Sequence, residues 1–139
     1  MYYIPESQHR AFFQQITKLV RPGGVILASL QDETSDYYAL YHQFAPYRYN
    51  LRRLGEWFEA EFGQSGWHVT SELLPGEVAT DSLEVAQQIA EFMLCYVRFE
   101  PLPKKSEIES WVKDTLWQAE KGLYLAKNPQ RMLVCRRIF

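Results

Sequence analysis

The spacing of apolar residues near the start of the chain predicts a helix, a sharp turn and a strand in succession. Apolar side chains recur every three or four positions over residues 8–20 and give this helix one apolar face: Phe12, Phe13, Ile16, Leu19 and Val20. Pro22 cannot continue a helix, and Gly23 or Gly24 can take the positive φ that a reversal needs. Residues 25–30 are apolar without alternation, which predicts a strand covered on both faces inside a parallel sheet.

The remaining pattern alternates between helical and extended segments. Ser35 and Pro46 bound a short helix, a second covers residues 50–62, and residues 67–74 form a strand closed by Pro75-Gly76. Two capping boxes open further helices over residues 82–96 and 106–121, from Asp81 with Glu84 and from Ser106 with Glu109. Residues 123–126 and 131–138 then read as a strand pair around a turn. This order predicts an α/β fold in a single unit, residues 1–139.

Composition narrows the classes of protein. The 139 residues are 47% hydrophobic, enough for one modest core, and the formal net charge of −2 offers no basic face for nucleic acid. The longest apolar run is too short for a membrane span, and no signal peptide is recognisable. Cys95 and Cys135 form no metal-binding motif; a disulfide is conceivable, but two buried free thiols in a reducing compartment are favoured. We therefore expect a cytoplasmic protein with no membrane and no nucleic-acid partner.

Few catalytic motifs are present. The chain contains neither GxGxxG nor GxxxxGK[ST], so no phosphate-binding loop is expected. The segment Gly63-Gln64-Ser65-Gly66 resembles a nucleophile elbow, but Trp67 stands where its last glycine should be. The three histidines, His9, His42 and His68, lie on different predicted elements. They favour surface or singly hydrogen-bonded roles over metal ligation, and no metal is expected.

Polar and aromatic residues gather after the first predicted strand. Asp32 and Glu33 stand in the loop at its carboxyl end, where α/β sheets bind ligands, so they are either part of a solvated loop or ligand-binding. Tyr37 and Tyr41 follow one helical turn apart on one face. They are either ordinary core residues or an aromatic wall that holds a flat or cationic substrate by stacking and cation–π contacts.

Taken together, residues 1–5, the helix, the segment Val20-Arg21-Pro22-Gly23-Gly24 and the strand resemble a class I S-adenosylmethionine-dependent methyltransferase, from just after its fourth strand through its fifth. The later order of helices, a strand, inserted helices and a terminal strand pair is similar to the rest of that fold through strands six and seven. The layout is closest to histamine N-methyltransferase-like proteins. The resemblance implies a partial Rossmann-like methyltransferase sheet, strands five to seven, with covering and inserted helices.

The resemblance also implies a substrate site. Tyr2 and Tyr3 match a tyrosine pair that lines the amine pocket of such enzymes, and Tyr37 and Tyr41 match two aromatics of the pocket wall. Asn128 matches an asparagine in the last hairpin that reaches the substrate amine. No catalytic residue is assigned, because the glutamate that these enzymes use on the substrate has no match in this chain.

The family's glycine-rich first motif and the acidic residue after its second strand, which bind the methyl donor, would lie before Met1. The resemblance thus implies the C-terminal, substrate-side portion of a methyltransferase that acts on a small molecule, with S-adenosylmethionine bound by the full-length protein and not by this chain alone. An interior strand over residues 25–30 would then have an uncovered edge, open to self-association. Two alternatives remain: a non-catalytic module that docks a partner chain or an aromatic ligand, and a homodimer that completes the sheet.

Overall fold

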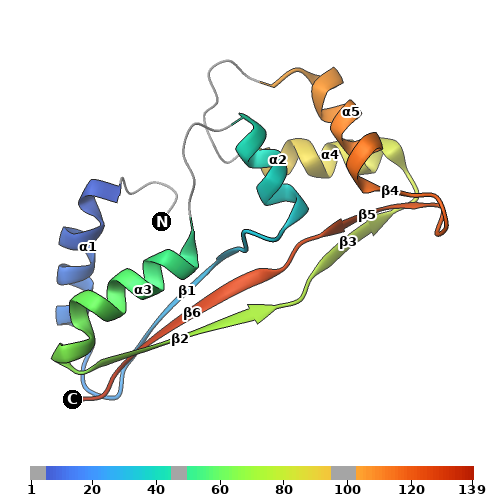
Figure 1. The fold of residues 1–139 in the computed structure, drawn as a ribbon. Coiled ribbons are helices and arrows are strands. Elements are labelled where there is room, and N and C mark those ends of the chain that lie inside the picture. The colour runs from blue at the N-terminus through green and yellow to red at the C-terminus, as the bar shows by residue number, and fades with distance from the viewer. Residues whose placement is uncertain (1–5, 45–49, 95–102) are drawn as a thin grey trace. The chain divides into compact units, whose positions relative to one another are not determined.

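The computed structural model describes residues 6–44, 50–94 and 103–139, which form a mixed α/β fold (Figure 1). Chain contacts divide it into two compact units. The first comprises the described parts of residues 1–30, 49–72 and 131–139, and the second those of residues 31–48 and 73–130. The elements in chain order are α1 (Glu6–Leu19), β1 (Val25–Gln31), α2 (Asp36–Phe44), α3 (Leu51–Phe62), η1 (Gly63–Ser65), β2 (Trp67–Leu74), β3 (Glu77–Thr80), α4 (Leu83–Leu94), α5 (Lys105–Leu116), β4 (Trp117–Gln118), β5 (Leu123–Lys127) and β6 (Gln130–Arg137).

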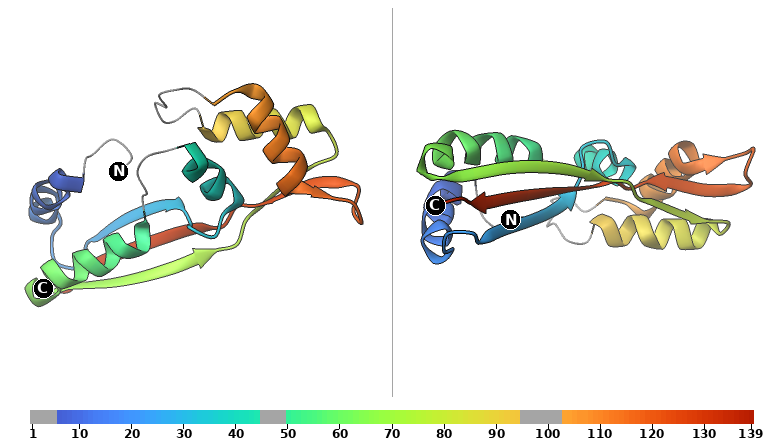
Figure 2. Two further views of the ribbon diagram at one scale, coloured as in Figure 1. Left: turned by 45° about the horizontal axis from the view of Figure 1, so that its top comes forward. Right: turned by 90° about the horizontal axis from the view of Figure 1, so that it is seen from below.

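The first unit is built on a three-stranded antiparallel sheet in the order β1-β6-β2, so the last strand of the chain lies in the middle (Figure 2). The turn before β1 joins this sheet directly: Gly23 N donates to Arg137 O (2.8 Å), and Arg137 N donates to Gly24 O (2.9 Å). Gly23 has a φ of 80°, as the sequence predicts for one glycine of this turn. Because β1 and β2 both run opposite to β6, they run parallel to each other.

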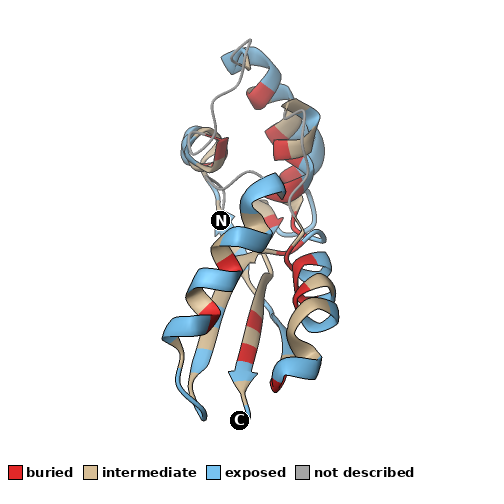
Figure 3. Ribbon diagram, turned by 90° about the vertical axis from the view of Figure 1, so that its left-hand side faces the viewer, coloured by how far each residue is buried: buried red, intermediate tan, exposed pale blue. Residues whose placement is uncertain are grey.

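Helices α1 and α3 cover one face of this sheet with an aromatic core. Phe13 of α1 and Phe58 of α3 are in edge contact, with ring centroids 5.4 Å apart, and Phe58 meets Trp67 of β2 in the same way at 5.5 Å. Leu133 and Cys135 of β6 complete the buried cluster. Figure 3 colours the buried residues of the chain red. The helices are anchored by polar contacts as well as by packing.

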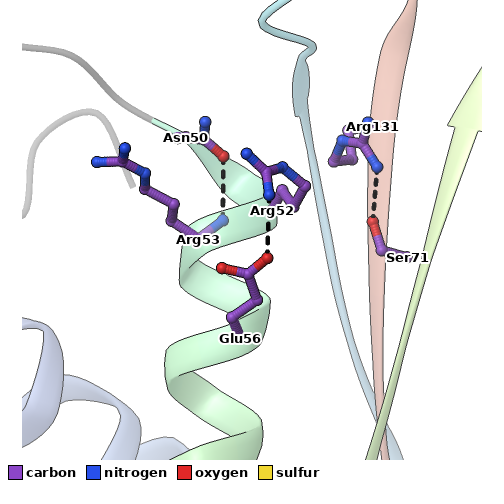
Figure 4. A network of polar contacts seen from close by, with 6 residues as sticks. All are labelled: Asn50, Arg52, Arg53, Glu56, Ser71 and Arg131. Atoms are coloured by element: carbon purple, nitrogen blue, oxygen red, sulfur yellow. Dashed lines mark hydrogen bonds and ion pairs between the residues drawn. The ribbon is translucent and has the colours of Figure 1, made fainter.

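Polar contacts fix the ends of these helices. Arg137 Nη1 donates to the carbonyl of Val20 at 2.5 Å, which brings a cation to the C-terminal end of α1. Asn50 caps α3 by accepting a hydrogen bond from Arg53 N at 3.0 Å (Figure 4). A further polar contact joins two strands: Arg131 Nη1 of β6 donates to Ser71 Oγ of β2 at 3.0 Å.

The prediction that residues 25–30 form a strand covered on both faces inside a parallel sheet is wrong on both counts, because β1 pairs antiparallel with β6 in a sheet that is covered on one face. Exposure alternates along β1: Ile26, Ala28 and Leu30 pack against the core, while Leu27 on the other face is 65% exposed and Val25 is 38% exposed. The described residues supply helices to one face of the sheet only. A strand without polar alternation therefore has one apolar face turned to solvent.

The second unit packs three helices against a second antiparallel sheet in the order β3-β5-β4. Helix α4 contacts α2, α5 and β3, while α2 and α5 both contact β5. The buried apolar side chains come from α2, α4, α5 and β5: Tyr37, Tyr38, Leu40, Tyr41, Ala86, Ala90, Leu94, Ile108, Val112, Leu116 and Ala126.

Three further expectations fail. The segments 123–126 and 131–138 do not pair with each other, since β5 lies between β3 and β4 whereas β6 lies between β1 and β2. Helix α5 ends at Leu116 rather than at residue 121, because Trp117 and Gln118 pair with β5 as a short strand. The caps also differ: Ser82 Oγ accepts from Val85 N (3.3 Å) at the start of α4, and Lys104 N donates to Glu107 Oε2 (2.8 Å) at the start of α5.

Candidate functional site

Asn128, in the short link between β5 and β6, is the centre of a polar cluster in the second unit. Its side-chain oxygen Oδ1 accepts hydrogen bonds from three side chains: Gln31 Nε2 at 2.9 Å, Ser35 Oγ at 3.2 Å and Gln130 Nε2 at 3.3 Å. Gln31 ends β1, and Ser35 stands just before α2. Asn128 is the residue for which the family resemblance implies a contact with the substrate, and it lies against the loop where ligands were expected.

Backbone contacts join the same two segments. Asp32 N donates to the carbonyl of Pro129 at 3.0 Å, and Lys127 N donates to Asp36 Oδ2 at 2.6 Å. The segment 31–36 and the link 127–130 are thus held together by side chains and main chain alike. These side-chain and main-chain hydrogen bonds fix the orientation of the Asn128 amide, as a preorganised binding group requires.

The link is also pressed against the connection between β2 and β3. Asn128 N donates to Gly76 O at 2.7 Å, and a Cβ atom at Gly76 would lie 2.5 Å from the carbonyl oxygen of Asn128. Only glycine fits this close backbone approach. Gly76 thus ends the strand, as the Pro75-Gly76 pair predicts, and also allows this close packing.

Asp32 is buried, with 2% of its surface exposed, and Glu33 beside it is exposed. Asp32 Oδ1 accepts from Thr34 N at 3.0 Å and from Thr34 Oγ1 at 2.7 Å, which closes the loop as an Asx turn. A solvated loop therefore describes Glu33 and not Asp32. The buried carboxylate shapes the segment that carries Ser35 and Asp36.

Tyr37 and Tyr41 lie on α2, one turn beyond this loop, and are 2% and 3% exposed. The Tyr37 ring lies 6.4 Å from that of Trp111 on α5. Burial, and secondarily the neighbouring carboxylate of Asp36, raises the pKa of Tyr37 to about 12. Both tyrosines are placed as core residues are, so their role in a substrate wall stays a prediction. Tyr2 and Tyr3 lie outside the described residues.

Three polar residues around Asn128 have contacts in the structure that the sequence pattern does not predict. Gln31, Ser35 and Gln130 are partners of Asn128, whereas the sequence pattern predicts only a capping role for Ser35 and none for either glutamine. The signal that could have found them is their position: each flanks a strand end or a helix start, where polar side chains converge in α/β folds.

The remaining candidate groups show no further site in the described residues. His42 stacks edge-on against Tyr38 with centroids 4.1 Å apart, His68 is exposed, and no cluster of three metal-binding side chains occurs in ranges 6–44, 50–94 and 103–139. Cys135 is a buried free thiol, as predicted, and desolvation raises its pKa to about 11; Cys95 lies outside the described residues. No helix in the described part of the chain is long and apolar enough to cross a membrane.

The glycines of the described residues do not gather into one loop. The three with positive φ, Gly23, Gly66 and Gly122, stand in separate turns, and none belongs to a glycine-rich motif after a strand. No protein-family model matches the chain, and no curated protein sequence matches it either.

Proposed function

We propose that this chain forms the substrate-side part of an S-adenosylmethionine-dependent methyltransferase that acts on a small molecule. The resemblance to histamine N-methyltransferase-like proteins makes an amine the plausible substrate. We further propose that the chain alone neither binds that cofactor nor transfers a methyl group. The observation that carries the proposal is the position of Asn128, whose amide is fixed against the end of β1 and the start of α2 by Gln31 and Ser35.

The strand arrangement supports the same proposal. The resemblance assigns β1 to the fifth strand, β2 to the sixth and the end of the chain to the seventh. In the structure β1, β6 and β2 share one sheet, although they are far apart in sequence. Their presence in one sheet supports the assignment of this chain to strands five to seven.

The chemistry of the cluster narrows the class of ligand. Three donors already occupy Asn128 Oδ1, so the group that remains to meet a ligand is the side-chain nitrogen Nδ2, which only donates. A donor suits a lone-pair acceptor such as a neutral amine. It does not suit an ammonium group, which brings only donors of its own. We therefore expect the neutral form of an amine ligand to bind.

The proposal is tested by titrating the 139-residue chain with small aromatic amines under ligand-observed NMR, at pH values below and above the pKa of each amine. Binding should strengthen as the amine loses its proton. Asn128→Asp replaces the donating nitrogen by an acceptor and should reverse this preference toward the ammonium form. Gln88→Glu makes the same chemical change at an exposed site on α4 and should leave it unaltered.

Two results would count against the proposal. Calorimetry that shows micromolar binding of S-adenosylmethionine to this chain would contradict the substrate-side assignment. Amine binding that is absent, or that is equal in the wild type and in Asn128→Asp, would remove Asn128 from the site.

A second candidate function is a non-catalytic module that docks a partner chain. One observation favours it: the exposed apolar face of β1, where Leu27 is 65% exposed. A contiguous exposed apolar patch is one of the marks of a protein–protein interaction site.

A further inference from the structure

Gln130, the first residue of β6, holds its side-chain amide against Asn128. Its nitrogen Nε2 lies 3.3 Å from Asn128 Oδ1 and 3.4 Å from the backbone oxygen of the same residue. Both of these oxygens are acceptors, so only the donating end of the Gln130 amide can face them. The acceptor Oε1 of Gln130 is therefore turned away from these two oxygens.

The backbone that carries this pair of amides is held in place. Asn128 N donates to Gly76 O at 2.7 Å, and Asp32 N donates to the carbonyl of Pro129 at 3.0 Å. Pro129 fixes its own φ and favours an extended conformation at the residue before it. The two amides are thus presented from a rigid link, as a specific binding site requires.

Two polar atoms of this pair remain for a ligand. Among the residues that the structure describes, Asn128 Nδ2 and Gln130 Oε1 have no hydrogen-bond partner, and both side chains are half-buried. The nitrogen and oxygen of one amide are about 2.2 Å apart, so Nδ2 and Oε1 both lie close to the 3.3 Å contact between the side chains. A ligand that approaches this contact meets a donor and an acceptor.

We propose that Gln130 determines which amines the site accepts: Asn128 Nδ2 donates to the lone pair of the amine nitrogen, and an N–H of that nitrogen donates to Gln130 Oε1. Gln130 takes this role only within the proposed function, which brings an amine to Asn128. A neutral primary or secondary amine offers a lone pair and an N–H on one nitrogen, whereas a neutral tertiary amine offers only the lone pair. The site therefore discriminates against tertiary amines, because they leave the acceptor of Gln130 without a donor.

The test compares benzylamine with its N-methyl and N,N-dimethyl derivatives by ligand-observed NMR, at a pH above the pKa of all three amines. The primary and secondary amines should bind the 139-residue chain roughly three- to tenfold more tightly than the tertiary amine. Gln130→Met keeps the length of the side chain but removes the acceptor, so this preference should disappear. Gln88→Met makes the same change at an exposed position on α4 and should keep the preference of the wild type.

Two results would overturn the role of Gln130. One is equal binding of the primary and tertiary amines to the wild type, a result that does not depend on the folding of any variant. The other is a preference that persists unchanged in Gln130→Met. Either result leaves the proposed function standing if Asn128→Asp still reverses the preference between the neutral amine and the ammonium form. A wild type that binds none of the three amines would contradict both the proposed function and the role of Gln130.

Discussion

Replacing Asn128 with alanine removes the acceptor on which three side chains of the second unit converge. A carbonyl oxygen has two lone pairs, and Gln130 Nε2 is shared with the backbone oxygen of Asn128 at 3.4 Å, so the three contacts amount to about two full hydrogen bonds. At about 0.5–1.5 kcal/mol each, Asn128→Ala should lower the free energy of unfolding by about 1–3 kcal/mol. The loss should be near the upper end, because the donors left behind are partly buried.

The assay is urea unfolding followed by far-ultraviolet circular dichroism and tryptophan fluorescence. Trp111 reports directly on the second unit, since its ring contacts Tyr37. Gln88→Ala, at an exposed position on α4, is the matched truncation and should change stability by less than about 0.5 kcal/mol.

A double-mutant cycle makes the result specific to the cluster. Ser35→Ala should cost about 1 kcal/mol in the wild type and almost nothing in Asn128→Ala, because its acceptor is already gone. If the two losses simply add, or if Asn128→Ala is as stable as Gln88→Ala, then Asn128 does not organise this segment and the reasoning about its fixed amide is wrong.

Three further outcomes are expected. Asn50→Ala should cost about 1 kcal/mol in urea unfolding through loss of the N-cap of α3, and Asn50→Asp should restore most of it. Phe58→Ala should cost about 3–5 kcal/mol because the side chain is fully buried, while Leu19→Ala, at a site 84% exposed, should cost less than about 0.5 kcal/mol. Burial raises the pKa of Cys135 to about 11 from the usual 9.0. The stability that the buried neutral thiol contributes is therefore present below pH 9 and is lost as pH rises toward 11. The free energy of unfolding should fall less over this pH range in Cys135→Ala than in the wild type.

Local signals in the sequence predicted the elements well. The strand over residues 67–74 has the predicted bounds, and β1 exceeds its prediction by one residue, Gln31. Gly23 takes the left-handed conformation that a reversal after a helix demands. These features depend on neighbours a few positions apart, and such neighbours are visible in a linear pattern.

Pairings between distant segments could not be predicted in the same way. The link at Asn128 and Pro129 has the sequence of a hairpin turn, but β5 and β6 belong to different sheets. The partner of β5 is β3, Glu77–Thr80, a strand too short to be recognised from the sequence pattern. The apolar run of β1 indicated burial on both faces, yet the described helices cover only one. Asn128 was identified by resemblance, and its bonds to Gln31 and Ser35 came only from the structure.

The central position of β6 has a consequence for the order in which the chain can fold. During synthesis β1 and β2 emerge well before the strand that joins them, and Arg137 reaches the end of α1 across 117 positions of sequence. Contacts of such long range slow folding, because loop closure must precede any gain from pairing. Until β6 leaves the ribosome, the uncharged β1 lacks the one neighbour that the described strands give it, and this nascent interval is when a chaperone would matter most.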